Sequence, residues 1–146
     1  MTVAIIKSKD CIDLRSRILR PNQPVELCHF AEDNFDSTFH LGIFKNERIV
    51  SNGTFMQNTN PHFSDNKNVY RLRGMATDTQ FQGQGLGRLI LEKSEVFLKQ
   101  KNCEIVWFNA RESAFGFYEK CGYKKIGDMF DIAGVGAHKV MFKKLF

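Results

Sequence analysis

The sequence predicts a single α/β domain of the α+β type, in which helices flank a mixed sheet. The chain has 146 residues, enough for one hydrophobic core and too few for two separate ones. Apolar runs and alternating segments typical of strands are interrupted by stretches with helical spacing. The order read from the N-terminus is helix, three strands, helix, strand, helix and two strands. We therefore expect one domain over residues 1–146.

The first third of the chain predicts a helix, a loop and a hairpin. The segment "DCIDLRSRILRPNQP" (residues 10–24) predicts a short helix that Pro21 and Pro24 end. Its loose apolar stripe consists of Ile12, Leu14, Ile18 and Leu19. The acidic stretch at residues 26–38 is expected to be a loop. The segment "TFHLGIFKNERIVSNGTFMQ" (residues 38–57) predicts a hairpin, because apolar runs flank the polar turn "KNER".

Four further segments predict strands. In "NVYRLRGMAT" (residues 68–77) the side chains alternate, which is typical of a strand with two different faces. The expected faces are Tyr70, Leu72 and Ala76 on one side, with Val69 and Met75 on the other. The continuous apolar run "EIVWFNA" (residues 104–110) predicts a strand covered on both faces. "YKKIGDMFDI" (residues 123–132) and "HKVMFKKLF" (residues 138–146) predict the last two strands.

Two helices are expected in the second half of the chain. The segment "GLGRLILEKSEVFLKQKN" (residues 85–102) has helical periodicity, with Lys93 as the exception in its apolar stripe. The expected apolar face consists of Leu86, Leu89, Ile90, Val96 and Phe97, and the polar face of Arg88, Glu92, Glu95 and Lys99. "RESAFGFYEKCGY" (residues 111–123) predicts a short helix that Gly122 stops, since glycine suits a left-handed helix end.

Charge and composition favour an anionic partner of small size. The formal net charge is +5, which attracts nucleotides, acidic cofactors, nucleic acid or anionic membranes. The basic residues are scattered along the chain, so neither a nucleic-acid partner nor a membrane partner is expected. The N-terminal "MTVAIIKSKD" lacks the apolar region of a signal peptide, and no apolar run reaches the length of a membrane span. The expected location is cytoplasmic.

Cysteines and histidines do not predict a metal site. The four cysteines show no CxxC or other metal-ligand spacing, and we expect them to be reduced thiols; they are Cys11, Cys28, Cys103 and Cys121. The four histidines lie far apart in the sequence; they are His29, His40, His62 and His138. We expect structural roles for them, with His138 the possible exception.

The stretch "QFQGQGLGRL" (residues 80–89) places three glycines at alternate positions where a helix is expected to begin. It is not a Walker loop, since no GxxxxGK[ST] is present. It also fails GxGxxG, because Arg88 stands at the sixth position counted from Gly83. Two interpretations stay open on these residues alone. The glycines either form a tight turn, or they let a phosphate approach the unpaired N–H groups at a positive helix end.

Several motifs, in the right order, resemble the GNAT superfamily of N-acetyltransferases. The acyl-CoA signature Q-x-x-G-x-G corresponds to Gln82, Gly85 and Gly87. "FYEKCGY" resembles the second block of the family, with Tyr118 and Tyr123 in the aromatic places. "RLRGMAT", "FNARESAFGFYEKCGY" and "AHKVM" resemble one uncharacterised bacterial branch. The resemblance is good over residues 38–146 and weaker before them. It implies a mostly antiparallel mixed sheet with a splay between the fourth and fifth strands, here "RLRGMAT" and "IVWFNA".

The resemblance implies transfer of an acetyl group from acetyl-CoA to a primary amine of a small molecule or peptide. The amine attacks the thioester directly in a ternary complex, acetyl-CoA is the acyl donor, and no metal is needed. A homodimer is also compatible with the family. The pantetheine arm would lie along the fourth strand and the pyrophosphate on the N–H groups of residues 84–88. The residues implied in binding are Met75, Ala76, Thr77, Gln82, Gly83, Gln84, Gly85, Leu86, Gly87, Arg88, Asn109, Arg111 and Ala114.

The resemblance also implies catalytic roles. Backbone N–H groups near Met75 would stabilise the oxyanion. Tyr118 matches the residue that protonates the thiolate leaving group, although a core aromatic on a helix is the plain structural alternative. The fourth strand carries Arg71 and Arg73 where relatives often have an acid. These arginines either bind an acidic acceptor or form a solvated face. A water relay is the default base, and the candidate side chains are Glu26, Asp36, His40 and His138.

Two positions depart from the family pattern. Thr79 replaces a proline that usually follows the fourth strand. Arg111 replaces the asparagine expected seven residues before Tyr118, while Asn109 stands two residues earlier. Either Asn109 or Arg111 would contact the CoA arm. Because no base is evident, a non-catalytic acyl-CoA-binding sensor or partner module is the alternative to an enzyme.

Overall fold

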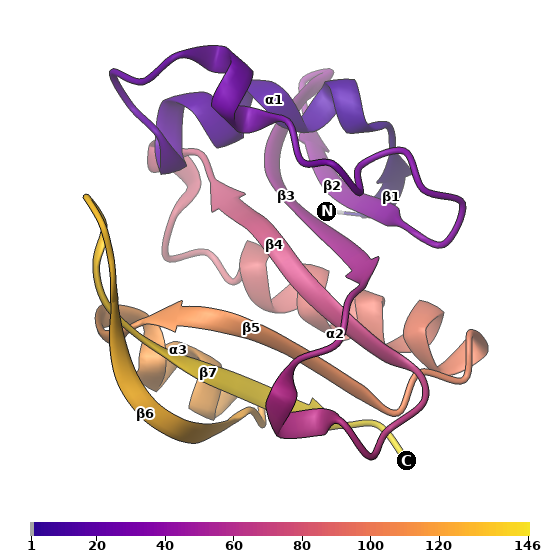
Figure 1. Ribbon diagram of the computed structural model, residues 1–146. Coiled ribbons are helices and arrows are strands. Elements are labelled where there is room, and N and C mark those ends of the chain that lie inside the picture. The colour runs from indigo at the N-terminus through magenta and orange to yellow at the C-terminus, as the bar shows by residue number, and fades with distance from the viewer. Residues whose placement is uncertain (1) are drawn as a thin grey trace. The chain divides into compact units, whose positions relative to one another are not determined.

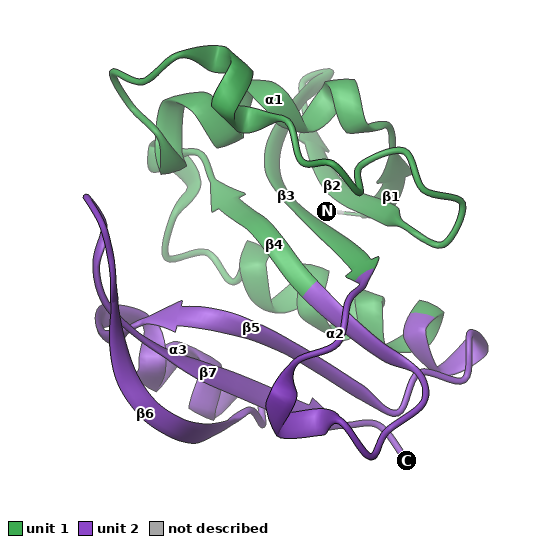
Figure 2. Ribbon diagram, in the orientation of Figure 1, with its two compact units in different colours: residues 1–56, 72–97 green, residues 57–71, 98–146 purple. Residues whose placement is uncertain are grey.

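The computed structural model describes residues 2–146 (Figure 1). The chain divides into two compact units (Figure 2). Unit 1 contains residues 1–56 and Leu72–Phe97, and unit 2 contains Gln57–Arg71 and Leu98–Phe146. β4 (Val69–Thr77) is therefore divided, with its first three residues in unit 2 and the remainder in unit 1.

The described residues form seven strands in the order β1-β2-β3-β4-β5-β7-β6. The other bounds are β1 (Val3–Ile6), β2 (Phe39–Lys45), β3 (Arg48–Gln57), β5 (Ile105–Arg111), β6 (Lys124–Ile132) and β7 (Gly136–Lys144). β4 and β5 pair in parallel, and their ladder joins Val69–Arg71 to Ile105–Trp107. The pairs β1–β2, β2–β3, β5–β7 and β6–β7 are antiparallel. The predicted mixed, mostly antiparallel sheet is confirmed.

Unit 1 begins with a strand that is absent from the sequence prediction. β1 pairs antiparallel with β2, from Val3 opposite Ile43 to Ile6 opposite His40. A four-residue edge strand is too short for its alternation to stand out from an ordinary apolar N-terminus.

The predicted first helix is confirmed, although its geometry is irregular. It consists of the 3-10 turn η1 (Ser8–Cys11), α1 (Ile12–Leu14) and the wider π turn η2 (Arg15–Leu19). It ends at Arg20, before Pro21. The expected apolar stripe is only partly correct. Leu14 is fully buried and Ile18 only half-buried, whereas Arg15, the residue beside Leu14, is 1% exposed.

The predicted hairpin is confirmed as β2 and β3. Asn46 and Glu47 form its turn with φ values of 50° and 65°. Two successive left-handed residues give the turn whose twist matches that of paired strands. The loop expected at residues 26–38 contains one short 3-10 turn, η3 (Val25–Cys28).

β4 runs from Val69 to Thr77 and contains Gly74, whose φ of +66° disturbs the side-chain alternation. A β-carbon placed on Gly53 would meet Leu72 Cδ1 and Met75 Sδ, each at 3.4 Å. Leu72 and Met75 therefore share one face, and the sequence prediction that placed them on opposite faces is wrong. A β-carbon on Gly74 would meet Arg15 Nε at 2.9 Å, so Gly74 faces the N-terminal helical segment.

α2 (Leu86–Gln100) is confirmed, but the predicted buried face is rotated. Leu89 is 37% and Val96 48% exposed. The buried residues are Leu86, Ile90, Leu91, Ser94 and Leu98. Ser94 occupies a core position because its hydroxyl donates a hydrogen bond to the Leu91 carbonyl at 2.6 Å. A hydroxyl satisfied inside its own helix can be buried, which an apolar pattern cannot reveal.

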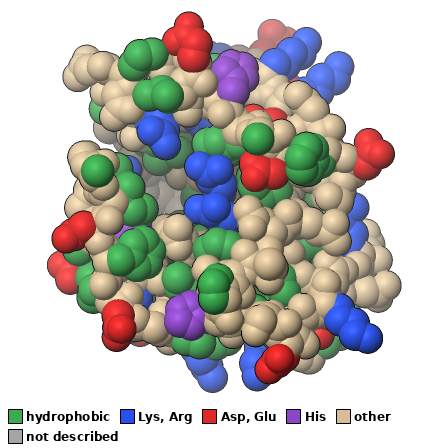
Figure 3. All heavy atoms as spheres, viewed as in Figure 1, with side chains coloured by type: hydrophobic (Ala, Val, Ile, Leu, Met, Phe, Trp, Pro, Cys, Tyr) green, Lys and Arg blue, Asp and Glu red, His purple; other side chains and the backbone are tan. Residues whose placement is uncertain are grey.

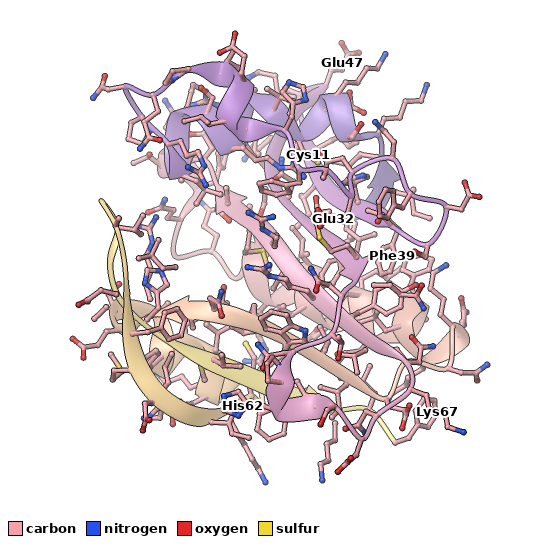
Figure 4. The ribbon with its side chains drawn as sticks, viewed as in Figure 1. Cys11, Glu32, Phe39, Glu47, His62 and Lys67 are labelled. Atoms are coloured by element: carbon pink, nitrogen blue, oxygen red, sulfur yellow. The ribbon has the colours of Figure 1, made fainter. Side chains whose placement is uncertain are left out.

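Unit 2 follows the sequence prediction closely. β5 is buried along most of its length, as the apolar run indicates. The 3-10 turn η6 (Glu112–Ala114) leads into α3 (Phe115–Lys120), and Gly122 follows with φ +93°. One hydrophobic cluster of this unit consists of Phe63, Val69, Ile105, Trp107 and Val140. His62, labelled in Figure 4, approaches Gly127 of β6, where a β-carbon would meet its Nε2 at 2.6 Å.

Candidate functional site

The loop between β4 and α2 has the backbone of an open, glycine-dependent turn. Gly83 and Gly85 have φ values of +79° and +80°. No heavy atom lies within 4 Å of a β-carbon built on either residue. The conformation therefore demands glycine, while the space beside it is free. Gly87 differs, because it is the second residue of α2 and its φ is not positive.

The start of α2 presents backbone donors. Leu89 N–H donates to the Gly85 carbonyl at 3.1 Å. The N–H groups of Leu86, Gly87 and Arg88 precede this bond, so they have no acceptor in the preceding turn of the helix. The helix dipole adds partial positive charge at the same place. Arg88 forms an ion pair with Glu92 at 3.1 Å, and both side chains are about 60% exposed. Such a surface pair contributes little and leaves the guanidinium available.

Gln82 has a defined role in this loop. Its amide Nε2 donates to the carbonyl of Thr77, the last residue of β4, at 3.0 Å. Thr77 Oγ1 also lies 2.8 Å from Ser51 Oγ of β3. The side chain of the motif glutamine thus ties the glycine loop to the end of the strand. The exposed Gln84 lies between the two left-handed glycines.

The β4 residues implied in binding lie beyond its ladder with β5. The ladder ends at Arg71, and Met75, Ala76 and Thr77 follow in unit 1. Ala76 is buried, whereas Met75 and Thr77 are half-buried. The structure therefore gathers these three residues and the glycine loop, residues 82–88, within unit 1.

Unit 2 contains Tyr118 in an aromatic environment. Its ring lies 4.3 Å from that of Phe108, 5.0 Å from Phe117 and 6.1 Å from Tyr123, measured between centroids. Burial raises the pKa of Tyr118 to about 12, with a smaller contribution from Cys121, while the charge of Arg111 opposes the rise. The phenol therefore holds its proton at neutral pH, as a proton donor must.

The other predicted residues of unit 2 lie at or after the end of β5. Asn109 is half-buried and pairs with Val140 on β7, while the exposed Arg111 pairs with His138. Ala114 ends η6 and immediately precedes α3. Asn109, Arg111, Ala114 and Tyr118 are thus brought together within unit 2.

The four candidate bases differ sharply. His40 Nε2 donates to the Asp33 carbonyl at 2.9 Å, and its Nδ1 lies 2.7 Å from Thr54 Oγ1. Burial also lowers the pKa of His40, so this ring is a neutral structural group with both nitrogens engaged. Glu26 is exposed on the 3-10 turn η3, and Asp36 is exposed in the turn that follows it.

His138 is buried, yet it retains a usable nitrogen. Its Nδ1 lies 2.7 Å from the Gly136 carbonyl, which can only accept, so Nδ1 carries the proton. In the neutral ring Nε2 then has the lone pair. Phe130 stacks on the ring at 6.0 Å. The tautomer follows from a local backbone contact, which the sequence does not reveal.

The sequence prediction overlooked a buried polar network around Arg15. The guanidinium binds both carboxylate oxygens of Asp33, at 2.7 and 2.9 Å. It also donates to the Cys28 carbonyl at 2.9 Å and to Thr54 Oγ1 at 2.7 Å. Burial alone would raise the pKa of Asp33, but hydrogen bonds from Arg15 and from Phe30 N–H outweigh it and lower that pKa. The sequence signal that could have revealed this network is Arg15 itself, a charged residue beside the predicted apolar stripe.

A cavity of about 440 Å³ in unit 1 is lined by residues 7–9, 33–35, Thr38 and His40, and none of the residues predicted to bind acetyl-CoA lines it.

Among residues 2–146, no group of three or more histidine, cysteine or acidic residues is placed to hold a metal. No helix in that range is both long and apolar enough to cross a membrane. Basic and acidic side chains are interspersed on the face shown in Figure 3.

The cysteines are free thiols. Burial raises the pKa of Cys11 to about 11, and Cys11 lies on the N-terminal helical segment (Figure 4). Burial raises the pKa of Cys103 to about 11 as well. Both groups are therefore protonated and poor nucleophiles at neutral pH.

Comparison with known proteins places this geometry in a family. The model of the acetyltransferase (GNAT) family matches residues 9–123. YitI of Bacillus subtilis (strain 168), named an uncharacterized N-acetyltransferase, is 38% identical over 145 residues, covering 99% of this chain and 97% of YitI.

Solved structures share the fold at low sequence identity. An aminoglycoside 6'-N-acetyltransferase complexed with coenzyme A has a TM-score of 0.75 at 12% identity, covering 100% of this chain and 98% of that one. The ribosomal-protein-S18-alanine N-acetyltransferase of Escherichia coli has a TM-score of 0.73 at 16% identity, covering 99% and 93%. The sequence motifs, the strand order and the family match agree, and the chain belongs to the acetyltransferase (GNAT) family.

Proposed function

We propose that this protein transfers the acetyl group of acetyl-CoA to a primary amine of a small molecule or peptide, by direct attack in a ternary complex. The observation that carries the proposal is the glycine turn before α2. Gly83 and Gly85 have left-handed backbones with free space beside them, and unpaired N–H groups follow at the helix start. In a GNAT family member, this arrangement suits a pyrophosphate.

Acetyl-CoA would bind through main-chain groups of unit 1. The N–H groups of Leu86, Gly87 and Arg88 would donate to the pyrophosphate, and the Arg88 guanidinium would exchange Glu92 for a phosphate. The pantetheine arm would lie along β4 at Met75 and Thr77, beyond the last residue that pairs with β5. An N–H near Met75 would stabilise the negative charge on the thioester oxygen during attack.

Tyr118 would act on the departing sulfur as a hydrogen-bond donor. Complete proton transfer from a phenol of pKa about 12 to a thiolate whose conjugate acid has a pKa of about 8.5 is uphill by roughly 5 kcal/mol. The phenol therefore stabilises the developing thiolate through a hydrogen bond. The ammonium form of the amine loses two protons in the overall reaction. One finally resides on the sulfur of CoA, and the other passes through the base to solvent.

The amine must lose a proton during the reaction, because an alkylamine is mostly protonated at neutral pH. The candidates for this step are a water relay and His138. Support for His138 comes from its Nε2, which keeps its lone pair while Nδ1 is held by Gly136. An imidazole is also a stronger base than the carboxylates of Glu26 and Asp36.

The test is a thiol-release assay with acetyl-CoA and a panel of primary amines, run on the wild type and on Tyr118→Phe. We expect amine-dependent release and a slower rate for the variant, whose ring packing is unchanged. Phe117→Tyr is the matched control, because Phe117 neighbours Tyr118 and is 41% exposed. Binding of acetyl-CoA without thiol release for any amine would instead favour a non-catalytic acyl-CoA-binding module.

A further inference from the structure

We propose that Arg73 recognises a carboxylate on the acceptor, so that the substrate is a small amine that also carries an acidic group. This inference rests on the proposed acetyl transfer. It concerns the acceptor, which neither the family match nor the motifs identify. All the residues that carry it lie in unit 1.

The Arg73 guanidinium is held by an aromatic ring. Its central carbon lies 3.9 Å from the centroid of Phe30. The guanidinium carbon of Arg15 lies 4.0 Å from the same centroid. Two guanidinium groups cannot occupy one face of a single ring at this distance, so Phe30 lies between them. A cation over an aromatic face is fixed in orientation while its N–H edge stays open.

Phe30 is itself fixed from the buried side. Its backbone N–H donates to Asp33 Oδ2 at 3.0 Å, and Asp33 is bound by Arg15 through both oxygens. Arg15 is 1% and Asp33 5% exposed. The buried Arg15–Asp33 pair therefore holds Phe30 in place, and the half-buried Arg73 stacks on the ring of Phe30.

Charge around Arg73 is not balanced. Arg15, Arg17, Arg48 and Arg88 each have a carboxylate within 4 Å. Across the described part of the chain, no carboxylate lies within that distance of Arg73, and its guanidinium stacks on the Phe30 ring. The charged groups that influence it are Glu32, Arg20, Arg15 and Asp33. Because Arg15 and Asp33 form an ion pair, the charges that remain in this group are those of Arg73, Arg20 and Glu32 (labelled in Figure 4), which sum to one positive charge.

Partial burial of Arg73 strengthens its attraction for an anion. Desolvation lowers the pKa of Arg73, with Glu32 opposing the effect. A cation that has lost part of its water gains more from an anionic partner than an exposed one does. The planar guanidinium edge matches a carboxylate through two parallel hydrogen bonds.

The position of Arg73 links this anion site to the reaction. Arg73 comes two residues before Met75 on β4, with Gly74 between them, so their Cα atoms are at most about 7 Å apart. The thioester is proposed to lie at Met75. A carboxylate on Arg73 would therefore orient the acceptor and bring its amine toward the acetyl group. Orientation of this kind increases the rate of attack as well as the affinity.

The experiment compares matched acceptors that differ only in the distal group. Thiol release is measured with a linear ω-amino carboxylate, its carboxamide, the ω-amino phosphonate and the unsubstituted alkylamine. We expect kcat/KM for the carboxylate to exceed that for the carboxamide by about 10- to 100-fold, the range of a charge-assisted hydrogen-bonded pair. Arg73→Gln should remove this preference and leave the carboxamide unchanged, Arg73→Lys should restore part of it, and Arg48→Gln should retain it.

Each possible result of these assays supports or contradicts a specific part of the proposal. Equal rates for carboxylate and carboxamide in an active wild type would overturn the inference and leave acetyl transfer standing. Equal loss for both acceptors in Arg73→Gln would show that Arg73 only supports Phe30. A preference for the phosphonate would assign the anion site to phosphate instead. Absence of transfer to every amine, together with no binding of acetyl-CoA, would remove the proposed function itself. The wild-type comparison needs no variant, so it holds even if a substitution prevents folding.

Discussion

Replacing Gly85 with alanine separates the two roles of the glycine loop. Gly85 has φ +80°, and no atom lies within 4 Å of an added β-carbon. The substitution therefore causes no clash in the free protein, and its destabilisation comes from left-handed strain of about 1–2 kcal/mol. The same β-carbon would project into the space proposed for the pyrophosphate. We expect a modest loss of stability and a large loss of acetyl-CoA affinity.

Gly134 provides a matched control. It has φ +76°, it also has no atom within 4 Å, and it lies in the turn between β6 and β7. Gly134→Ala should therefore lose the same 1–2 kcal/mol or so, from the same strain, without any effect on acetyl-CoA binding. The pair isolates the ligand effect from the backbone effect.

The assay is thermal or denaturant unfolding with and without acetyl-CoA. At 100 times its Kd, a ligand stabilises the folded state by about 2.7 kcal/mol. If Gly85→Ala weakens binding about 30-fold, the same concentration stabilises that variant by only about 0.9 kcal/mol. Gly134→Ala should keep the full 2.7 kcal/mol or so. Full stabilisation of Gly85→Ala, or an equal loss in Gly134→Ala, would refute the assignment of the loop.

Three further predictions concern the other side chains. Tyr118→Phe should lower kcat by about 10²-fold with little change in the KM for acetyl-CoA. Because the pKa of this phenol is raised to about 12 in the folded protein, its contribution to stability is lost between pH 10 and 12. The variant should lack that loss. His138→Gln should lower kcat if Nε2 is the base, and a kcat like that of the wild type would leave the water relay. Asp33→Asn should destabilise the fold by about 3–5 kcal/mol, because it leaves Arg15 without its carboxylate partner. Since the pKa of Asp33 is lowered in the folded protein, its contribution to wild-type stability should be lost as the pH falls through that pKa. Acid unfolding monitored by circular dichroism measures this loss.

Local patterns explain why much of the fold was predictable. The hairpin at Asn46 and Glu47, the apolar strand β5 and the glycine stop at Gly122 each depend on residues close together in sequence. The predictions that were wrong depend on contacts distant in sequence. Gly74 disturbs the alternation of β4 because it packs against Arg15, and Arg15 is buried because it meets Asp33 in a later loop.

The candidate site likewise contains features that the sequence predicts and features that it does not. The glycine loop was found from its spacing, because glycine adopts positive φ angles more readily than any other residue. The environment of Tyr118, the tautomer of His138 and the support beneath Arg73 were not predictable. The rings next to Tyr118 and Arg73 come from other segments of the chain, and the tautomer of His138 depends on the orientation of a nearby backbone carbonyl.

The most direct test of the central claim is a titration of the wild-type protein with acetyl-CoA, followed by its unfolding midpoint. The account predicts stabilisation that grows by about 1.4 kcal/mol for each tenfold increase of ligand above the Kd. A midpoint that stays constant up to millimolar acetyl-CoA would contradict the assignment of the α2 N-terminus and the loop before it as the acetyl-CoA site.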